Sequence, residues 1–217
     1  MYVPKAFEMS ELAALHDFIE RYSFATLVSD LDGQPFATHL PLVLDRGGRF
    51  GALLGHVARA NPHWRASGGE SLAIFLGPHS YVSPSWYATS PAVPTWNYAA
   101  VHVYGRLRVI DDVAWVSGLL DRLIAIYESS TPSPWSGVLP SEFKSRLIGA
   151  IVGFRIEIDR IEAKFKLGQN RSLDDQAGML RNLEEQPGQQ GRELAQFIRR
   201  QTVARDSRED RVPLAAR

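Results

Sequence analysis

The fold of this chain is decided by residues 24–57, FATLVSDLDGQPFATHLPLVLDRGGRFGALLGHV, where three mainly apolar runs follow one another. The runs are 24–29, 36–44 and 50–57, and they are separated by Asp32-Gly33 and by Arg46-Gly47-Gly48. Asp-Gly and Gly-Gly pairs between apolar runs are typical of the tight turns of β-hairpins. The stretch therefore predicts three consecutive antiparallel strands.

The rest of the chain adds strands and helices around this stretch. Further strands are predicted at 71–76, 99–110 and 151–165, and helices at 11–22 (with Ser10 as N-cap), 112–127 and 141–148. Strands joined mainly by hairpins, with helices at the ends and in one crossover, indicate an α+β fold. Closing an antiparallel sheet into a barrel removes its exposed edges. We therefore expect an antiparallel six-stranded β-barrel with peripheral helices.

Composition excludes several classes of protein. The chain has 217 residues, no Cys and a formal net charge of +0. The length predicts one domain with at most an appendage, and the lack of Cys excludes disulfides and thiolate metal sites. The six His form no HExxH motif or compact cluster with carboxylates, so no metal site is expected. The neutral charge argues against a generally basic protein that coats nucleic acid, but it does not exclude a local basic patch.

Motifs of common enzymes and of membrane proteins are absent from the sequence. It contains no G-x-G-x-x-G after a strand, no P-loop and no G-x-S-x-G, and Ser141-Glu142-Phe143-Lys144 matches S-x-x-K without its companion motifs. No apolar run approaches the about 20 residues of a spanning helix, and the first residues do not resemble a signal peptide. We expect a cytoplasmic protein without membrane contact. The sequence identifies no catalytic residue and leaves open whether the protein is an enzyme.

The composition changes near residue 170. Phe197 is the only aromatic residue after that point, and charged residues of both signs become dense. We predict a barrel domain at 1–170 and a charged helical extension at 171–217, mobile from Ala204 onward. A short helix at 194–198 could dock on the barrel. The extension is expected to be dispensable for ligand binding.

Residues 55–64, GHVARANPHW, form a candidate anion site. A strand ends near Val57, and Asn61-Pro62 is typical of a helix start, with Asn as the cap and Pro at the first helical position. Free backbone N–H groups at a helix start attract anions, and the guanidinium of Arg59 is suited to phosphate. An ordinary connection with a surface Arg explains the same residues equally well.

Two further segments could border a ligand. Residues 77–98, GPHSYVSPSWYATSPAVPTWNY, are rich in Pro, Trp and Tyr, and so long an aromatic connection suggests the wall of a flat ligand or a loop packed over a barrel end. Residues 164–171, KFKLGQNR, place two Lys on one face of a strand, followed by Gln and Asn. A solvated strand end would have the same pattern.

Taken in order, these segments resemble a known family. The runs MYVPKAF, THLPL (38–42), GHVARANPHW, GPHSYVSPSWY, VPTWNYAAVHVYGRLRVIDD, IVGFRIEI and KFKLGQN are similar to those of the PaiB-type FMN-binding negative transcriptional regulators, over about residues 1–183. The resemblance implies a flavin-binding split barrel, related to pyridoxamine-phosphate oxidase and flavin reductases. It also implies a homodimer with two FMN sites at the subunit interface.

The resemblance also implies which residues contact FMN. Thr38, His39 and Leu40 would line the flavin from a strand, and His56, Arg59 and Asn61 would hold the phosphate. Trp96, Asn97 and Tyr98 would close the site from the partner subunit, and Lys166, Gln169 and Asn170 would contact ribityl or phosphate. The family is expected to have Ser where this chain has Gly168.

Three functions remain open at this point. The protein could be a flavin-dependent transcriptional regulator, a flavin oxidoreductase or flavin reductase, or a barrel that binds another planar cofactor such as haem. Direct DNA binding has little support, because the sequence shows no helix-turn-helix with a basic recognition helix, and Arg192, Arg199 and Arg200 form only a small basic patch.

Overall fold

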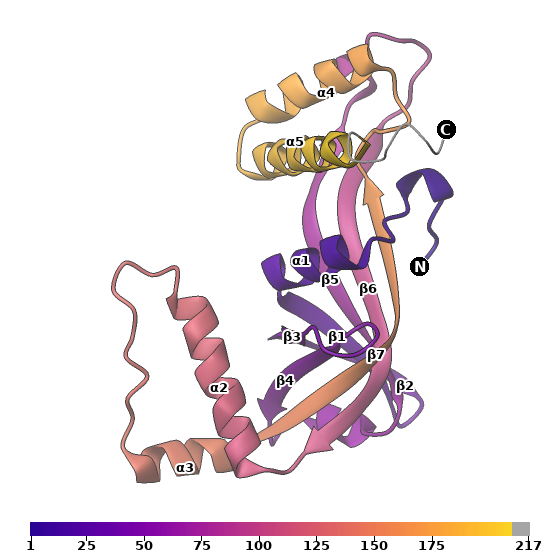
Figure 1. Cartoon of the computed structure of the whole chain (residues 1–217). Coiled ribbons are helices and arrows are strands. Elements are labelled where there is room, and N and C mark those ends of the chain that lie inside the picture. The colour runs from indigo at the N-terminus through magenta and orange to yellow at the C-terminus, as the bar shows by residue number, and fades with distance from the viewer. Residues whose placement is uncertain (210–217) are drawn as a thin grey trace. The chain divides into compact units, whose positions relative to one another are not determined.

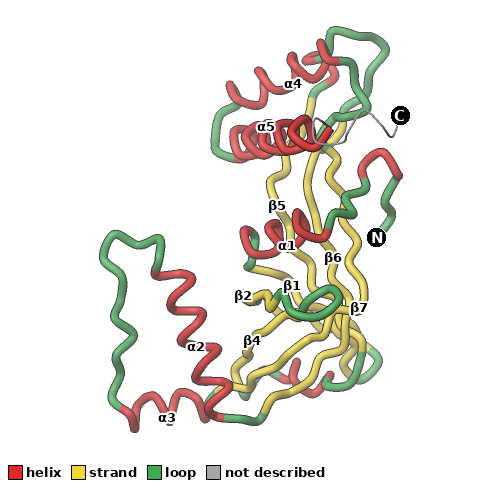
Figure 2. The backbone as a smooth tube through the Cα atoms, viewed as in Figure 1, coloured by secondary structure: helices red, strands yellow, loops and turns green. Residues whose placement is uncertain are grey.

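The structure is a computed structural model that describes residues 1–209. The described strands are β1 (Phe24–Leu31), β2 (Gln34–Pro41), β3 (Val43–Asp45), β4 (Ala52–Ala58), β5 (Glu70–Val82), β6 (Thr95–Ile110) and β7 (Ile151–Lys166). The described α-helices are α1 (Leu12–Arg21), α2 (Val113–Glu128), α3 (Ser141–Gly149), α4 (Leu173–Glu185) and α5 (Gln190–Glu209). Short 3-10 helices are η1 (Lys5–Phe7), η2 (Pro62–Ala66) and η3 (Pro84–Trp86). Figure 1 and Figure 2 show these elements along the chain.

The α+β fold with an antiparallel sheet is confirmed, and the sheet has seven strands instead of six. The predicted strand at 36–44 is divided at Leu42 into β2 and β3. The Asp32-Gly33 hairpin is present, because Leu31 of β1 pairs directly with Gln34 of β2. The helix predicted at 11–22 is α1, but it begins after Glu11 and Ser10 does not cap it.

The strand order explains how the sheet forms a barrel. The order is β2-β1-β5-β6-β7-β4-β3, so β2 and β3 lie at opposite ends of it. Only Leu42 separates these two strands along the chain, so the sheet must curl until its ends meet. The Leu42 side chain is buried at this junction, at 1% exposure.

Contacts divide the chain into two compact units. One contains Ser10–Phe75 and Val101–Glu162, and the other contains Met1–Met9, Leu76–Ala100 and the described residues from Ala163 to Glu209. The strands β5, β6 and β7 contribute residues to both units. We call the first the barrel unit and the second the helical unit. The predicted division after residue 170 stays a prediction.

The core of the barrel unit is apolar and closely packed. Leu27, Leu53, Phe75 and Phe154, one from each of four strands, are completely buried. On the outside of the barrel, α2 packs through Leu119 and Leu123 against Leu54 of β4 and Val43 of β3. The apolar stripe that predicted this helix therefore covers the β3–β4 edge.

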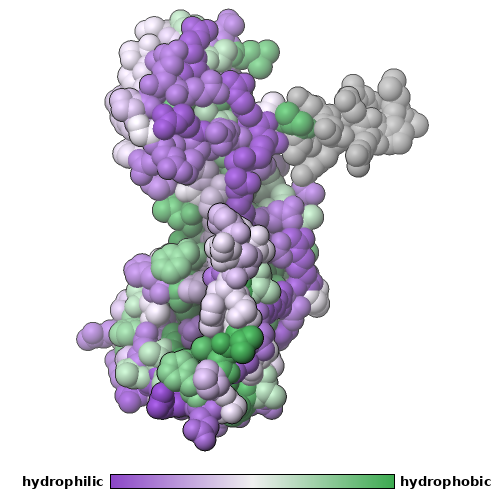
Figure 3. Space-filling model, turned by 90° about the vertical axis from the view of Figure 1, so that its left-hand side faces the viewer, coloured by the Kyte–Doolittle hydropathy of each residue, from purple (hydrophilic) through white to green (hydrophobic). Residues whose placement is uncertain are grey.

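In the helical unit, α4 and α5 lie side by side across the ends of the strands (Figure 1). Met179, Leu183 and Leu194 are completely buried, and the ring of Phe197 packs 5.4 Å from that of Phe165 on β7. In the view of Figure 3 the outward surface of these helices is largely hydrophilic. The docked helix at 194–198 is part of α5. This buried apolar surface shows that the segment beyond Leu173 contributes to the fold, while its predicted dispensability for ligand binding stays a prediction.

The aromatic segment at 77–98 is less of a loop than the sequence suggested. Strand β5 continues to Val82 and β6 begins at Thr95, leaving η3 and residues 87–94 as the connection. The strand predicted at 71–76 is therefore longer than expected and includes Pro78. This proline is tolerated because the register of β5 with β1 covers only Ser71–Ile74, so Pro78 lies beyond it, where one side of β5 is an edge.

The C-terminal end was predicted to be mobile from Ala204. The backbone of α5 is helical to Glu209, and residues 210–217 lie outside the described part of the chain. The predicted mobility of this end stays a prediction.

Candidate functional site

A chain of polar side chains crosses the interior of the barrel unit. We call it the His63 cluster, and its members are Ser29, Thr38, Asn61, His63 and Ser71. Nε2 of His63 lies 2.9 Å from Oγ of Ser29, which lies 2.7 Å from Oγ of Ser71. Nδ1 of His63 lies 2.8 Å from Oγ1 of Thr38, and the amide of Asn61 donates to the same oxygen at 3.2 Å.

This cluster explains the local fold around η2. The start of the short helix is confirmed, with Pro62 at its first position and Oδ1 of Asn61 accepting from the backbone N–H of His63 at 3.0 Å. The His63 side chain is 1% exposed, and burial lowers its pKa, so the ring is neutral at physiological pH. Both ring nitrogens and both ends of the Asn61 amide are therefore engaged by the protein itself.

The strand geometry separates the predicted residues Thr38, His39 and Leu40. Neighbouring side chains on a strand point to opposite faces. Thr38 faces the His63 cluster and Leu40 is buried, while His39 is exposed and its Nδ1 lies 3.0 Å from Oγ1 of Thr26 on β1. The structure therefore does not bring the three side chains to one side of the strand.

Arg59 lies where β4 ends, but its guanidinium already has partners. Nε donates to the carbonyl of Gly149 at 2.9 Å and Nη2 donates to the carbonyl of Ile151 at 3.0 Å. Gly149 is the last residue of α3 and Ile151 is the first of β7. Two of its five N–H donors are thus used, and the other three have no hydrogen-bond partner within residues 1–209 and could serve a ligand. Arg59 therefore has a structural role that the sequence did not indicate, while its predicted contact with phosphate stays a prediction.

His56 is half-buried on the face of β4 covered by α2. It pairs with Gly153, where an added Cβ would lie 2.8 Å from Val116 and 2.9 Å from Trp115 of α2. Among the described residues, Nδ1 of His56 is buried without a hydrogen-bond partner, and burial lowers the pKa of the ring. A buried ring nitrogen without a partner is costly, so this atom is a polar group that the described residues leave unsatisfied.

In the helical unit, one face of the strand ends carries aromatic and cationic side chains. We call it the open face, and its members are His79, Tyr81, Trp96, Tyr98, Lys164 and Lys166. The ring of Trp96 lies 6.2 Å from that of Tyr81 and 6.5 Å from that of His79. Trp96 is 54% exposed and Tyr81 is 41% exposed, which is unusual for side chains with so much apolar surface.

The cations of the open face lie on β7. Nζ of Lys164 lies 5.4 Å from the ring of Tyr98 and 5.4 Å from that of Tyr2. Lys166 donates to Oγ1 of Thr95. Burial and the nearby charges of Lys164 and Arg171 lower the pKa of Lys166. Positive charges crowded in this way would be stabilised by a bound anion.

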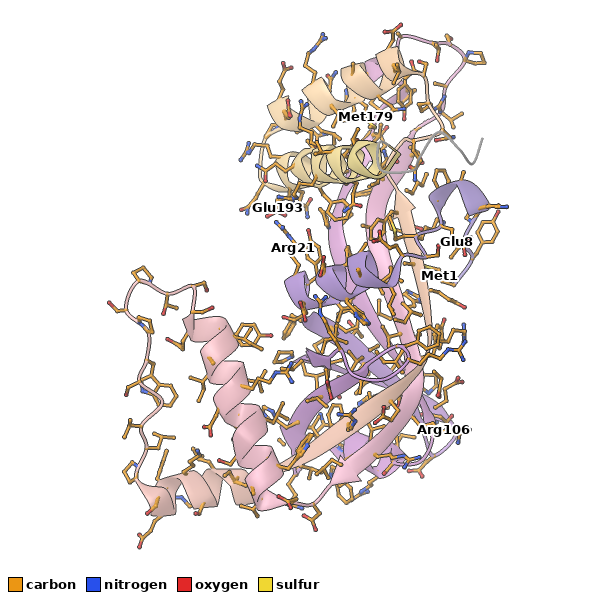
Figure 4. All side chains as sticks on the ribbon, viewed as in Figure 1. Met1, Glu8, Arg21, Arg106, Met179 and Glu193 are labelled. Carbon is orange, nitrogen blue, oxygen red and sulfur yellow. The ribbon has the colours of Figure 1, made fainter. Side chains whose placement is uncertain are left out.

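The remaining predicted residues lie elsewhere in the helical unit. Asn97 points away from the open face, is 1% exposed, and its amide nitrogen lies 3.1 Å from the sulfur of Met179 on α4 (labelled in Figure 4). Gln169 bonds the backbone of Phe165 and Leu167, and so closes the turn after β7. Asn170 is exposed on the same turn. Of the group assigned to closing the site, only Trp96 and Tyr98 share a face.

Gly168 is explained by its surroundings. Its φ of +84° lies in the left-handed region, and an added Cβ would lie 3.0 Å from Cε of Met179. A Ser at this position would be strained and crowded. The Met179 side chain occupies the space that a side chain at position 168 would need, which explains why this chain has Gly where the family is expected to have Ser.

The sequence did not single out two residues with prominent roles. His63 lies inside GHVARANPHW, and its position two residues after the capping Asn61 was an available signal, since the chain must turn inward there. Asp175, in the first turn of α4, has a 1% exposed side chain that bonds Thr89. Its acidic neighbours made it resemble an ordinary surface charge.

Two absences were found within the described residues. No group of three or more His, Asp or Glu residues among residues 1–209 is placed to hold a metal ion. No helix in the same part of the chain is both long and apolar enough to cross a membrane.

Comparison with solved structures identifies the fold. The chain resembles the flavocytochrome Anf3 from Azotobacter vinelandii, with a TM-score of 0.60, 17% identity, and coverage of 76% of this chain and 72% of that one. It also resembles the FAD and heme binding protein from Mycobacterium smegmatis, with a TM-score of 0.57, 19% identity and 78% of each chain covered. The curled antiparallel sheet with peripheral helices is thus that of the flavin-binding split barrels.

Sequence comparison identifies the family. Residues 1–160 match the family described as "Putative FMN-binding domain". The "Protease synthase and sporulation protein PAI 2" of Bacillus subtilis (strain 168) is 35% identical over 202 residues, which cover 91% of this chain and 96% of that protein. The chain belongs to this FMN-binding family, of the PaiB type, and its cofactor class is flavin.

The described residues fit a flavin mononucleotide. The open face offers exposed rings of Trp96 and Tyr81 for a flat aromatic group, and the ammonium of Lys166, with its lowered pKa, for an anion. In the barrel unit, Nδ1 of His56 is unsatisfied and the guanidinium of Arg59 has two bonded donors, as far as the described residues are concerned. These are the kinds of group that a phosphorylated flavin needs.

Proposed function

We propose that this protein is a homodimeric FMN-binding regulator of the PaiB type, with each flavin held by residues from both subunits. The observation that carries the proposal is the open face, where the rings of Trp96 and Tyr81 are exposed and half-buried ammonium groups are crowded together. On the opposite face, Asn97 contacts α4 and Phe165 packs against α5. A flat, anionic, aromatic ligand satisfies the exposed rings and the crowded ammonium groups at once. FMN has this chemistry, and the family supports the same cofactor.

The open face would contact the flavin through rings and ammonium groups. Trp96 and Tyr98 of one subunit would pack against the isoalloxazine. Stacked aromatic pairs contribute about 0.5–1.5 kcal/mol beyond the effect of their buried area. Lys166 would reach the ribityl chain or the phosphate, together with Gln169 and Asn170 on the following turn. Bound FMN would supply a ring that accepts and returns electrons.

The barrel unit of the other subunit would supply the remaining contacts. Thr38 and Leu40 would contribute through one face of β2, and His39 through the other face or its backbone. His56, Arg59 and Asn61 would approach the phosphate. Arg59 is suited to this because it stays charged at any working pH and, within the described residues, only two of its donors have hydrogen-bond partners.

A homodimer is supported by the exposed apolar surface of the open face. Large uncovered aromatic side chains usually mark an interface, and self-complementary pairing is the commonest solution in homo-oligomers. Light scattering should return about twice the 24.2 kDa of one chain at micromolar protein. A value of one chain mass would contradict the dimer and the two-subunit site together.

The regulatory role is supported by the family relationship, and it is tested separately. A mobility shift with DNA at physiological salt distinguishes a regulator that binds DNA from other flavoproteins. Turnover of NAD(P)H by the flavin-loaded protein would support an oxidoreductase instead. A cytoplasmic location stays an expectation.

The absorption spectrum of the purified protein is the first experiment. Flavin bands support the proposal, whereas a haem spectrum would favour a different planar cofactor. Protein obtained free of cofactor should gain thermal stability with FMN, by about 2.7 kcal/mol at a hundred times the dissociation constant. Riboflavin should bind more weakly than FMN. No shift with FMN at high micromolar concentration would contradict the proposal.

A further inference from the structure

Helix α4 is fastened to the segment that precedes the open face. The carboxylate of Asp175 is buried at 1% exposure in the first turn of this helix. Oδ1 accepts from the backbone N–H of Thr89 at 2.9 Å, and Oδ2 accepts from the Thr89 hydroxyl at 2.7 Å. The Thr89 hydroxyl, followed by the backbone of Thr89 and Ala88, lowers the pKa of Asp175. The carboxylate is therefore charged at neutral pH and holds one residue of the connection by two bonds.

A second contact lies one helical turn further along α4. At Gly178, an added Cβ would lie 2.3 Å from the carbonyl oxygen of Trp86. The helix backbone and the end of η3 therefore approach so closely that only glycine fits between them. This contact is independent of the Asp175 carboxylate, because it depends on backbone and shape.

A third set of contacts fixes the two ends of the connection. The guanidinium of Arg171, just before α4, lies 4.4 Å from the ring centre of Tyr87. The sulfur of Met179 contacts the amide of Asn97, the residue that follows Trp96 on β6. The segment 86–97 is thus held at Trp86, Tyr87, Thr89 and Asn97 by α4 and the turn before it.

The connection itself has little regular structure to hold it. Residues 87–94 form neither helix nor strand, and Pro91 and Pro94 lack backbone N–H donors. Trp96 is the second residue after this stretch, and its ring lies on the open face. A free segment would sample many arrangements, and a ligand would then bind only to the fraction with the correct one.

We propose that α4 is the positioning element of the flavin site, and that Asp175 and Gly178 act through the 86–97 segment to hold Trp96 in place for the ligand. This inference rests on the proposed function, because it names what orders the aromatic wall of that site. Asp175 is a positioning residue and does not touch the flavin. The acidic helix that the sequence presents as an extension is thereby part of the site's framework.

The first test removes the hydrogen-bonding groups of Asp175 and Thr89 one at a time. Asp175→Asn removes the charge, and Asp174→Asn is the matched control because Asp174 is the exposed neighbour in the same turn. Thr89→Val removes the hydroxyl, and Thr89→Ser should restore it. We expect Asp175→Asn and Thr89→Val to weaken FMN binding about tenfold, and Asp174→Asn and Thr89→Ser to leave it within twofold. Equal affinities for Asp175→Asn and Asp174→Asn would overturn the inference.

The second test does not require flavin. Hydrogen exchange of the flavin-free protein should quicken at 86–97 in Asp175→Asn, while the amides of β1 and β4 keep their protection. Unchanged exchange at 86–97 would overturn the inference that Asp175 orders this segment. If the wild-type protein binds no FMN, the proposed function fails, and this measurement still decides whether α4 orders the segment.

A third variant tests the close approach. Gly178→Ala should displace Trp86 and weaken FMN binding at least as much as Asp175→Asn does, with a changed flavin absorption or fluorescence spectrum. Gly118→Ala in α2 is the control, because an added Cβ there meets nothing within 4 Å. If Gly178→Ala fails to fold, Asp175→Asn and the exchange measurement still decide the inference. A folded Gly178→Ala that binds FMN like wild type would contradict it.

Discussion

The His63 cluster and the open face use similar polar groups but differ in how those groups are satisfied. In the His63 cluster, every ring nitrogen and hydroxyl named above bonds another group of the protein, and the ring is buried. On the open face, Trp96 and Tyr81 are exposed, and Lys166 lies near two other cations. Groups that the protein satisfies internally stabilise the fold, whereas groups left exposed or in like-charge contact are available to a ligand.

This difference changes which of the predicted site residues we expect to contact the cofactor. Asn61 and Thr38 were selected as flavin contacts, yet their side chains close a network inside the barrel unit. Arg59 has both a structural role and unused donors. The substitutions below separate residues that hold the fold from residues that hold the cofactor.

The largest effect is expected from a truncation ending at Arg171. It removes α4 and α5 and exposes the apolar surface that Met179, Leu183 and Phe197 bury. Losing even one large buried side chain typically costs 2–5 kcal/mol, so the truncated chain should be insoluble or lack a cooperative thermal transition. Soluble expression and calorimetry measure this. A truncated chain that melts cooperatively and binds FMN like wild type would show that the extension is dispensable after all.

The next largest effect is expected from His63→Ala. It removes one hydrogen-bond partner each from the hydroxyls of Ser29 and Thr38, which keep Ser71 and Asn61, and it opens a cavity. The change should cost roughly 2–4 kcal/mol of unfolding free energy. Urea denaturation measures the loss. If the fold survives, the ratio of FMN to riboflavin affinity should stay near wild type. A selective loss of FMN would place His63 in the phosphate site instead.

The same residue predicts a pH dependence. Burial lowers the folded-state pKa of His63 below its unfolded value of about 6.5, so the unfolded chain binds the extra proton first as pH falls. Stability should therefore fall below about pH 6.5 and be regained as the pH rises. Urea titrations of wild type and His63→Ala between pH 5 and 8 measure this, and the slope that His63 contributes should be absent in the variant.

A smaller effect, confined to binding, is expected from Arg59→Ala. If its unused donors hold the phosphate, FMN affinity should fall by about 1.5–3 kcal/mol while riboflavin affinity changes little. Unfolding free energy should fall as well, because the bonds to Gly149 and Ile151 are lost. Isothermal titration with both ligands distinguishes the two roles. A loss of stability with FMN affinity within twofold would move the phosphate to Lys164 or Lys166.

The smallest effect is expected from Lys166→Met in the flavin-free protein. Removing a partly buried cation from the neighbourhood of Lys164 and Arg171 relieves repulsion, so stability at pH 7 should stay equal or rise by up to about 1 kcal/mol. FMN binding should nevertheless weaken. Thermal melts with and without FMN measure both effects. A destabilised free protein would show that Lys166 serves the fold.

The sequence predicted most strands and helices because their signals are local. Asp32-Gly33 specifies a hairpin, the apolar stripe of α2 specifies an amphipathic helix, and Asn61-Pro62 specifies the start of η2. The motifs also identified the family and its cofactor class, since long aromatic runs such as VPTWNYAAVHVYG are specific.

Only the tertiary structure decided how these pieces are used. The extension of β5 through Pro78 depends on where β1 stops pairing, and the bonds of Arg59 depend on carbonyls about ninety residues away. The burial of Asp175 depends on Thr89, which is 86 residues distant in the chain. Side-chain type and spacing determine local conformation, but whether a polar group is satisfied depends on partners that only folding brings within hydrogen-bond distance.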